Sequence, residues 1–286
     1  MALGNVLTAM VTPFDSKGNI DFNKIPKLMN FLMENGTDGV IVGGTTGESA
    51  TLSIEEKAAL YEHAVKASAG RIPVYAGTGM NDTYATAELT VRAEKLGVDG
   101  IMLVSPYYNK PSQRGMYEHF KTIAAKTSLP VMLYNVPGRC VVNLLPETVI
   151  ALSKIPNITS VKEASGNLDQ MTTIISNTPD DFEVYCGDDS LTLPALAVGA
   201  DGVVSVSGHI IGNEMQEMVK AFKKGDIKTA ATIHQRLLPT MKGMFVAPSP
   251  APVKTALQLK GMDVGGVRLP LLPLTAEERQ VVKDLL

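Results

Sequence analysis

The stretch GVDGIMLVSP, residues Gly97–Pro106, decides the fold of this chain. A glycine ends a helical segment, a short turn with an aspartate follows, and a run of apolar residues then reads as a buried strand. The same Gly-x-Asp-Gly joint occurs at Gly36–Gly39 and at Gly199–Gly202, each time before another apolar run. A joint that leads from helix to strand and recurs along the chain is typical of a repeated β/α unit.

Eight such runs divide the sequence, and they are continuously apolar instead of alternating, as expected of parallel strands covered on both faces. The runs are Val6–Thr12, Gly39–Gly44, Pro73–Thr78, Gly100–Pro106, Pro130–Val136, Ile158–Ser165, Glu183–Asp188 and Gly202–Ser207. Amphipathic segments separate them, and Ser53 opens one of these with a Ser-x-x-Glu capping pattern. Eight units, spaced roughly 20–35 residues apart, predict an α/β fold of the TIM (β/α)8 barrel type and not a doubly wound sheet.

The residues after the eighth run form four further helical segments. These segments are Asn213–Lys224, Ile227–Phe245, Ala251–Leu259 and Ala276–Leu286. We expect the first to close the barrel and the others to form a C-terminal helical appendage packed on it. The predicted organisation is therefore a catalytic barrel over residues 1–224 and a helical region over residues 225–286.

The composition is that of an ordinary soluble enzyme, with 286 residues, of which 45% are hydrophobic and 19% are charged. The net charge of −3 and the lack of a basic tail argue against nucleic acid or an anionic membrane as a partner. No apolar run is long enough to span a bilayer, and no signal peptide is evident. Two cysteines fit a reducing cytoplasm, and four scattered histidines give no metal-ligand spacing. We expect no metal and no cofactor.

In a TIM barrel, the chemistry gathers at the C-terminal ends of the strands. Lys162 lies near the end of the run Ile158–Ser165. A lysine at a strand end often extends its head group into water along the sheet. A lysine that is buried there instead has a lowered pKa, and its neutral amine is a nucleophile. The side chains at the neighbouring strand ends decide between these alternatives.

The ends of the second and fifth predicted strands carry three polar features with two possible uses each. The turn GGTTGES, residues Gly43–Ser49, matches neither a P-loop nor a dinucleotide fingerprint. It is either a tight turn or an anion cradle in which backbone N–H groups and the hydroxyls of Thr45 and Thr46 hold a carboxylate. Tyr134 is either a packed aromatic or an acid/base that hydrogen-bonds a hydroxyl such as that of Thr45. Arg139 is either solvated or makes a two-pronged contact with a substrate carboxylate.

Together these groups form one coherent site at the barrel mouth. A carboxylate cradle beside a lysine points to a 2-oxo acid as the electrophile. Lys162 would form an imine with its carbonyl carbon, and loss of a proton would give an enamine. The enamine would then add to an aldehyde, or the reverse reaction would occur.

The chain closely resembles the dihydrodipicolinate synthase family of the pyruvate-dependent class I aldolases. The similarity runs nearly end to end through TAMVTPF, GGTTGESATL, PVYAGTG, SPYYNKPSQRG, LPVMLYNVPGR, VKEASGN, YCGDDS, MFVAPSPAPVK and RLPLLPLT. The lysine, the tyrosine and the G-x-T/S-G-E turn are shared across the superfamily. The doubled threonine of GTTGE, the PYYN loop and YNVPGR are more specific to this family.

The resemblance implies a lyase of the carbon–oxygen class that condenses pyruvate with L-aspartate 4-semialdehyde and then cyclises the product, a step of lysine (diaminopimelate) biosynthesis. It also implies a cytoplasmic homo-oligomer, and it favours a tetramer, a dimer of dimers, over a dimer. The chemical step is assigned to Lys162 as the Schiff-base lysine and to a proton relay. The relay consists of Tyr134, Thr45 and Tyr108, with Tyr108 inserted from a neighbouring subunit.

The substrate contacts that the resemblance implies fall on four further residues. Thr46 and the turn backbone would hold the pyruvate carboxylate, and Arg139 would bind the carboxylate of the semialdehyde. The backbone around Gly187 and Val204 would line the site.

Two departures from the family pattern stand out. Cys140 follows the arginine where the family usually has threonine, and we expect a change of local packing and not a new nucleophile. Family members that lysine inhibits often carry histidine and glutamate at the positions of Lys57 and Ala85, although Ser49, Ala50, Asn81 and Tyr107 are kept. Our hypothesis is that lysine feedback is weak or absent, and inhibition at micromolar lysine would refute it.

Three other functions are alternatives for a barrel with these residues. Another enzyme of the superfamily, such as N-acetylneuraminate lyase or a 2-keto-3-deoxy sugar acid aldolase, would keep Lys162 and Tyr134, but its polyol substrate does not need Arg139. A non-catalytic oxo-acid sensor or scaffold is disfavoured because that lysine and that tyrosine are both present. A phosphate-handling barrel is disfavoured because the turn Gly187-Asp188-Asp189 after the seventh run is acidic.

Overall fold

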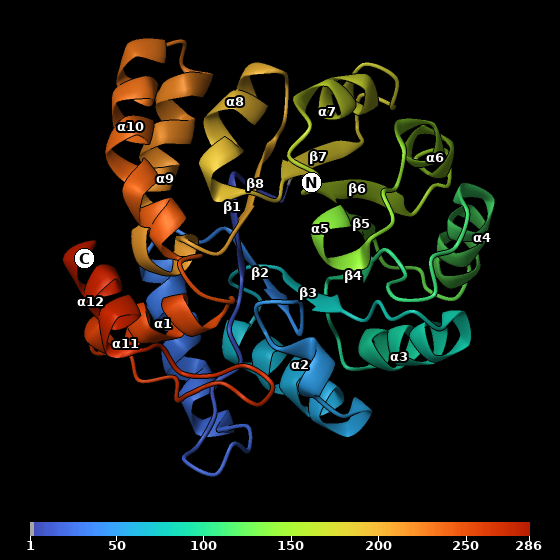
Figure 1. Cartoon of the computed structure of the whole chain (residues 1–286). Coiled ribbons are helices and arrows are strands. Elements are labelled where there is room, and N and C mark those ends of the chain that lie inside the picture. Colours follow the sequence, from blue (N-terminus) through green and yellow to red (C-terminus); the bar gives the residue numbers. More distant parts are fainter. Residues whose placement is uncertain (1–2) are drawn as a thin grey trace.

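The computed structural model describes residues 3–286, and in it eight parallel strands close into a barrel in chain order. Figure 1 shows the strands at the centre with the helices around them. The strands are β1 (Val6–Ala9), β2 (Gly39–Val42), β3 (Val74–Gly77), β4 (Gly100–Val104), β5 (Val131–Asn135), β6 (Ile158–Glu163), β7 (Glu183–Cys186) and β8 (Gly202–Ser205). The predicted TIM barrel is confirmed.

The Gly-x-Asp-Gly joints are built alike. The first glycine has a positive φ of 81°, 84° or 105°, a conformation that glycine adopts without steric cost at the end of a helix. The aspartate side chain accepts a hydrogen bond from a backbone N–H near the start of the preceding strand. The pairs are Asp38 with Val6 at 3.0 Å, Asp99 with Val74 at 2.8 Å and Asp201 with Val184 at 2.7 Å. Each joint therefore fixes the start of one strand against its neighbour.

Side chains along each strand alternate between the barrel interior and the helix layer. One cluster fills the interior, with Leu7, Ile41, Tyr75, Met102, Met132, Tyr185 and Val204 among its members. A larger cluster lies between the strands and the helices, with Val6, Leu28, Leu60, Phe120, Val161 and Met215 among its members. Tyr134 belongs to the interior cluster, so the last inward positions of the strands open toward the C-terminal mouth.

Eight helices follow the strands around the barrel. They are α1 (Ile25–Glu34), α2 (Ile54–Ser68), α3 (Thr83–Lys95), α4 (Gln113–Ala124), α6 (Pro146–Leu152), α7 (Leu168–Ile175), α8 (Thr192–Ala197) and α9 (Gly208–Lys223). The predicted capping pattern at Ser53 is confirmed, because its Oγ accepts from the N–H of Glu56 at 3.1 Å and the Glu56 carboxylate accepts from the N–H of Ser53 at 2.9 Å.

The predicted helix Asn213–Lys224 forms the main part of α9, and a short helical segment from Gly208 joins it across a kink at Ile211. Gly212 breaks the sequence pattern, but it serves packing: a Cβ at this position would collide with the carbonyl oxygen of Asn35. A glycine at a close helix contact thus resembles a helix breaker in the sequence.

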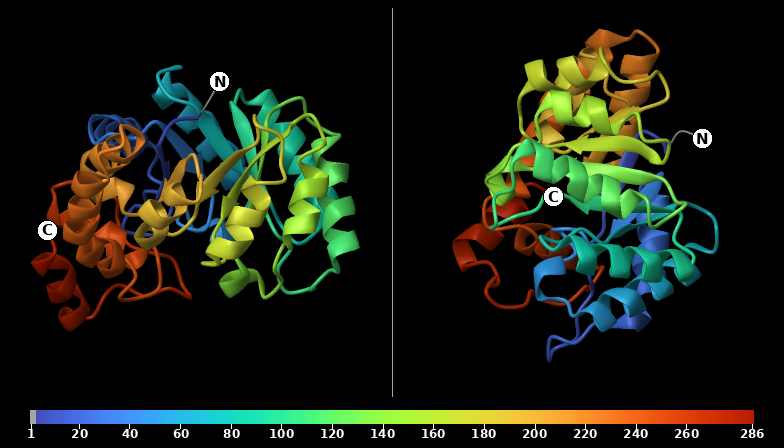
Figure 2. Two further views of the ribbon diagram at one scale, coloured as in Figure 1. Left: turned by 90° about the horizontal axis from the view of Figure 1, so that it is seen from above. Right: turned by 90° about the vertical axis from the view of Figure 1, so that its right-hand side faces the viewer.

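The C-terminal helices α10 (Ile227–Gly243), α11 (Ala251–Leu259) and α12 (Ala276–Asp284) lie on one side of the barrel (Figure 2). Helix α10 packs along α9, and α11 contacts both α9 and α12. Within residues 3–286, no helix combines the length and the apolar character needed to cross a membrane.

Candidate active site

Lys162 and Tyr134 lie side by side at the end of β6 and β5. The strand register pairs the two residues directly, and both are only 5% exposed. The Lys162 Nζ atom lies 4.4 Å from the centroid of the Tyr134 ring. In the part of the chain that the structure describes, no carboxylate forms an ion pair with Lys162. Lys162 is therefore a buried amine beside a phenol, and its head group does not extend into bulk water.

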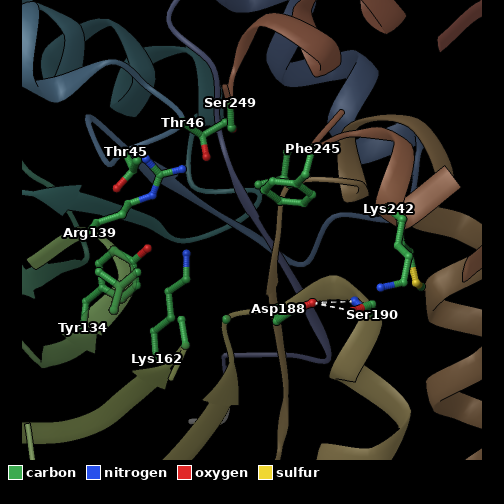
Figure 3. A pocket seen from close by; sticks show the side chains of 15 residues that line it. Thr45, Thr46, Tyr134, Arg139, Lys162, Asp188, Ser190, Lys242, Phe245 and Ser249 are labelled. Carbon is green, nitrogen blue, oxygen red and sulfur yellow. Dashed lines mark hydrogen bonds between the residues drawn. The ribbon is translucent and has the colours of Figure 1, made fainter. Parts of the chain in front are cut away.

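These two side chains face a cavity of about 420 Å³. Figure 3 shows Lys162, Tyr134 and Arg139 directed toward one shared space. Six of the eight predicted site residues line the cavity: Thr45, Thr46, Tyr134, Arg139, Lys162 and Gly187. Strand ends far apart in the chain thus bring a nucleophile, a phenol, two hydroxyls and a guanidinium to one mouth.

The turn after β2 has the form of an anion cradle. Two hydrogen bonds fix the turn. The N–H of Glu48 donates to the Thr45 carbonyl at 3.0 Å, and the Thr12 hydroxyl donates to the Gly47 carbonyl at 2.6 Å. The N–H groups of Thr45, Thr46 and Gly47 donate no hydrogen bond within residues 3–286. Thr45 and Thr46 line the cavity, so two free amides and two hydroxyls lie at its wall, a group of donors suited to holding a carboxylate.

Arg139 belongs to the one-turn helix α5 (Pro137–Cys140), which the sequence reading missed. The helix ends at Val141, whose positive φ of 68° turns the chain sharply. The Arg139 side chain is exposed and makes no hydrogen bond or ion pair within the described part of the chain. In Figure 3 it lies between Thr45 and Tyr134 at the mouth. Its five donors are free for a carboxylate from solvent.

Gly187 makes room for the lysine. A Cβ at this position would lie 3.1 Å from Cε of Lys162 and 2.5 Å from Cβ of Ala164. The two remaining predicted residues do not line the cavity. Val204 is buried in the barrel interior, and Val206, two residues further along, lines the cavity. Tyr108 is 90% exposed and has a positive φ of 73°.

A wall of the cavity comes from the C-terminal region, and the sequence reading missed it. Its four residues are Met241, Lys242, Phe245 and Ser249. The segment MFVAPSPAPVK, which contains Phe245 and Ser249, matches the family pattern, but nothing in its local sequence indicates a position at the barrel mouth. Asp188 and Ser190 complete the rim, where the Asp188 carboxylate accepts from the N–H of Ser190 at 2.9 Å and from its hydroxyl at 2.8 Å.

A buried ion pair joins the cradle to this C-terminal region. Lys254 of α11 lies 2.6 Å from the Glu48 carboxylate, and both side chains are almost fully buried. Lys254 also donates to the Gly266 carbonyl at 2.7 Å, and the N–H of Arg268 donates to Glu48 at 2.9 Å. Glu48 itself has a positive φ of 58°. Burial lowers the pKa of Lys254 to about 8, although the Glu48 carboxylate opposes this shift.

A second cavity of about 320 Å³ adjoins the first and shares Thr45, Tyr134 and Arg139 with it. Cys140 lines this second cavity and is 2% exposed. Burial raises the pKa of its thiol to about 11, so that the thiol stays protonated near neutral pH. Within residues 3–286, no three His, Cys, Asp or Glu side chains gather as a metal site.

Comparisons with known proteins agree along the whole chain. The model of the Dihydrodipicolinate synthetase family matches residues 2–286. A 4-hydroxy-tetrahydrodipicolinate synthase of Bacillus velezensis is 64% identical over 279 residues, which are 98% of this chain and 96% of the relative. The crystal structure of a dihydrodipicolinate synthase from Bacillus anthracis has a TM-score of 0.98 at 59% identity and covers 100% of this chain and 98% of that chain.

A second similar structure is the dihydrodipicolinate synthase of Cyanidioschyzon merolae with lysine bound. Its TM-score is 0.97 at 46% identity, and the match covers 99% of this chain and 97% of that chain. The family model and the identities over nearly full length agree with the barrel and its buried strand-end lysine. This chain belongs to the dihydrodipicolinate synthetase family.

Proposed function

We propose that this chain is a 4-hydroxy-tetrahydrodipicolinate synthase, a lyase that condenses pyruvate with L-aspartate 4-semialdehyde in lysine biosynthesis. The observation that carries the proposal is the buried Lys162 beside Tyr134 at a cavity whose opposite wall has the form of an anion cradle. A 2-oxo acid is the class of substrate that needs an amine for its carbonyl carbon and a cradle for its carboxylate.

The reaction begins with attack of the Lys162 amine on C2 of pyruvate. Loss of water gives the imine, and loss of a proton from C3 gives the enamine. C3 of the enamine then bonds to the aldehyde carbon of the semialdehyde, whose oxygen takes up a proton. The amino group of the semialdehyde part attacks C2, the Lys162 amine leaves, and the ring is closed. Over the whole reaction, one water is released for each pyruvate and semialdehyde that are joined.

The proton transfers are assigned to Tyr134, with Thr45 and Tyr108 completing a relay. Tyr134 is supported by its place beside the lysine, and Thr45 by its place on the cavity wall. Tyr108 enters the relay from a neighbouring subunit, and its exposed ring on a loop with a positive φ supports this use. The chain is accordingly a homo-oligomer, with a tetramer, a dimer of dimers, favoured over a dimer.

Two carboxylates are bound at different places. Thr46 and the turn amides hold that of pyruvate, because the cradle lies opposite the lysine. Arg139 holds that of the semialdehyde, because its guanidinium is free at the mouth. The backbone at Gly187 and near Val204 borders the bound pyruvate. Barrel residues 1–224 carry the reacting groups, and residues 225–286 supply the second wall of the cavity.

Lysine regulates the enzyme weakly or not at all. Lys57 is 5% exposed, and burial lowers its pKa. An amine at this position, and Ala85 where inhibited members of the family often have glutamate, give the ammonium of a lysine effector no acceptor. A coupled assay checks this, and inhibition by micromolar lysine would contradict it. The enzyme works in the cytoplasm without a cofactor, on small molecules and not on nucleic acid or membranes.

The test of the proposed function is to trap the imine. Borohydride reduction in the presence of pyruvate should leave an adduct on the peptide that contains Lys162, seen by mass mapping. A reductase-coupled assay with aspartate semialdehyde should then show condensation. An adduct on another peptide would contradict the mechanism. An adduct on Lys162 without condensation would indicate an aldolase of the same superfamily that cleaves a different 2-oxo acid.

A further inference from the structure

The strand pair that carries Lys162 and Tyr134 also carries a second pair of residues one position further on. The register places Asn135 of β5 beside Glu163 of β6, directly after Tyr134 beside Lys162. Because side chains alternate along a strand, the first pair faces the mouth and the second pair faces the helix layer. Asn135 and Glu163 are 0% and 1% exposed. The outward pair is therefore a buried polar contact behind the reacting groups.

Glu163 is held without a cation. Its carboxylate accepts from Asn135 Nδ2 at 3.0 Å, from Gln170 Nε2 at 3.0 Å and from the N–H of Ser165 at 2.7 Å. No lysine, arginine or histidine of the described chain forms an ion pair with it. A buried carboxylate that is held only by amide donors keeps those donors in fixed positions, because the loss of one donor would leave a carboxylate oxygen without a hydrogen-bond partner.

The same network closes the loop that carries Arg139. Asn135 Nδ2 donates to Asn143 Oδ1 at 2.7 Å, and the N–H of Leu144 donates to Asn135 Oδ1 at 2.9 Å. Asn143 Nδ2 also donates to Gln170 Oε1 at 2.8 Å, and Gln170 Nε2 donates to Asn143 Oδ1 at 3.2 Å. Residues 136–143 thus form a loop whose two ends are joined by the side chain of Asn135, and Arg139 lies in its middle.

We infer that Asn135, Asn143, Glu163 and Gln170 are positioning residues, which hold Arg139 at a fixed place relative to Lys162. One end of the network consists of Asn135 and Glu163, the residues that follow Tyr134 and Lys162, and the other end lies at the residues Asn143 and Leu144 after the Arg139 loop. The Arg139 side chain has no partner of its own in the described chain, so the loop alone sets where its guanidinium lies. The network therefore controls how tightly the semialdehyde binds and does not affect the formation of the imine between pyruvate and Lys162.

The inference rests on the proposed function, and the variant Asn143→Ala tests it. This half-buried side chain makes three hydrogen bonds of the network. We expect the KM for aspartate semialdehyde to rise about tenfold or more, because a displaced guanidinium binds its carboxylate poorly. The KM for pyruvate and the borohydride-trapped adduct should change by less than about twofold.

Asn157→Ala is the matched control. Asn157 is also half-buried and also makes three hydrogen bonds, to the carbonyls of Ala124, Thr127 and Leu129, but it precedes β6 at the opposite end of the barrel. It should lower the melting temperature as much as Asn143→Ala does and leave both KM values alone. If Asn143→Ala does not fold, Asn143→Ser, which keeps a short polar group, replaces it.

A double-mutant cycle separates positioning from general damage. In the Arg139→Ala background, Asn143→Ala should cause no further rise in the KM for the semialdehyde. An unchanged semialdehyde KM in Asn143→Ala, equal rises for both substrates, or full additivity with Arg139→Ala overturns the inference. A wild-type enzyme that gives no pyruvate adduct would instead contradict the proposed function itself.

Discussion

Lys162 and Lys254 are both buried lysines, yet their surroundings are opposite. Lys162 faces a cavity, touches a phenol ring and has no carboxylate partner in the described chain, whereas Lys254 is ion-paired with Glu48 and bonded to a carbonyl. Burial alone thus does not identify the reactive lysine. A lysine with a buried counter-ion is fixed in that ion pair, whereas a lysine that faces a cavity beside a proton carrier is available for chemistry.

Replacing each lysine by methionine should separate an effect on turnover, at Lys162, from an effect on stability, at Lys254. Lys162→Met should reduce turnover by at least about 10³-fold, because no imine can form. It should unfold no earlier than the wild type, since it removes a buried amine that has no ionic partner. The coupled assay and a thermal melt measure both. Turnover within tenfold of the wild type would show that another amine attacks pyruvate.

Lys254→Met should produce the reverse pattern. It leaves the Glu48 carboxylate buried without its cation, which costs about 3–5 kcal/mol. The melting temperature should then fall by roughly 6–20 °C in a chain of this size. The double variant Glu48→Gln/Lys254→Met should recover much of the loss. A single variant that melts like the wild type would mean that the pair contributes little.

The smallest expected effect is the pH dependence that Lys254 gives to the free energy of unfolding. The folded protein releases the Lys254 proton near pH 8, whereas an unfolded lysine holds it up to its ordinary pKa of 10.5. Between these values the unfolded state binds more protons, so raising the pH favours the folded state. Relative to Lys254→Met, the wild type should therefore gain stability from pH 8 to pH 10. Denaturant unfolding at several pH values measures this difference, and a constant or falling difference would contradict it.

The sequence predicted the barrel well because its signals are local. The Gly-x-Asp-Gly joints combine a glycine at a helix end with an aspartate that binds a nearby strand, and both are short-range features. The strand-end rule then placed Lys162, Tyr134, Arg139 and the cradle at one mouth, because all strands of a parallel barrel end on the same side.

What the sequence missed depends on contacts across the whole chain. The cavity wall at Phe245 and Ser249 and the pair of Glu48 with Lys254 join residues about 200 positions apart, and no local pattern records such contacts. Val204 shows another limit of the sequence. Its side chain is buried in the barrel interior, whereas Val206, two residues further along and past the end of β8, lines the cavity. Periodicity does not specify at which height along a strand the cavity begins.

The aspartate joints bear on how the barrel is assembled. They tie β2 to β1, β4 to β3 and β8 to β7 across only 32, 25 and 17 residues. Each tied pair can form as soon as its own segment has left the ribosome, because short loops close at little entropic cost. Closure between Val11 and His209 spans 198 residues and must wait. The cavity wall lies beyond even His209, so a nascent chain acquires its fold in pieces and its active site only at the end.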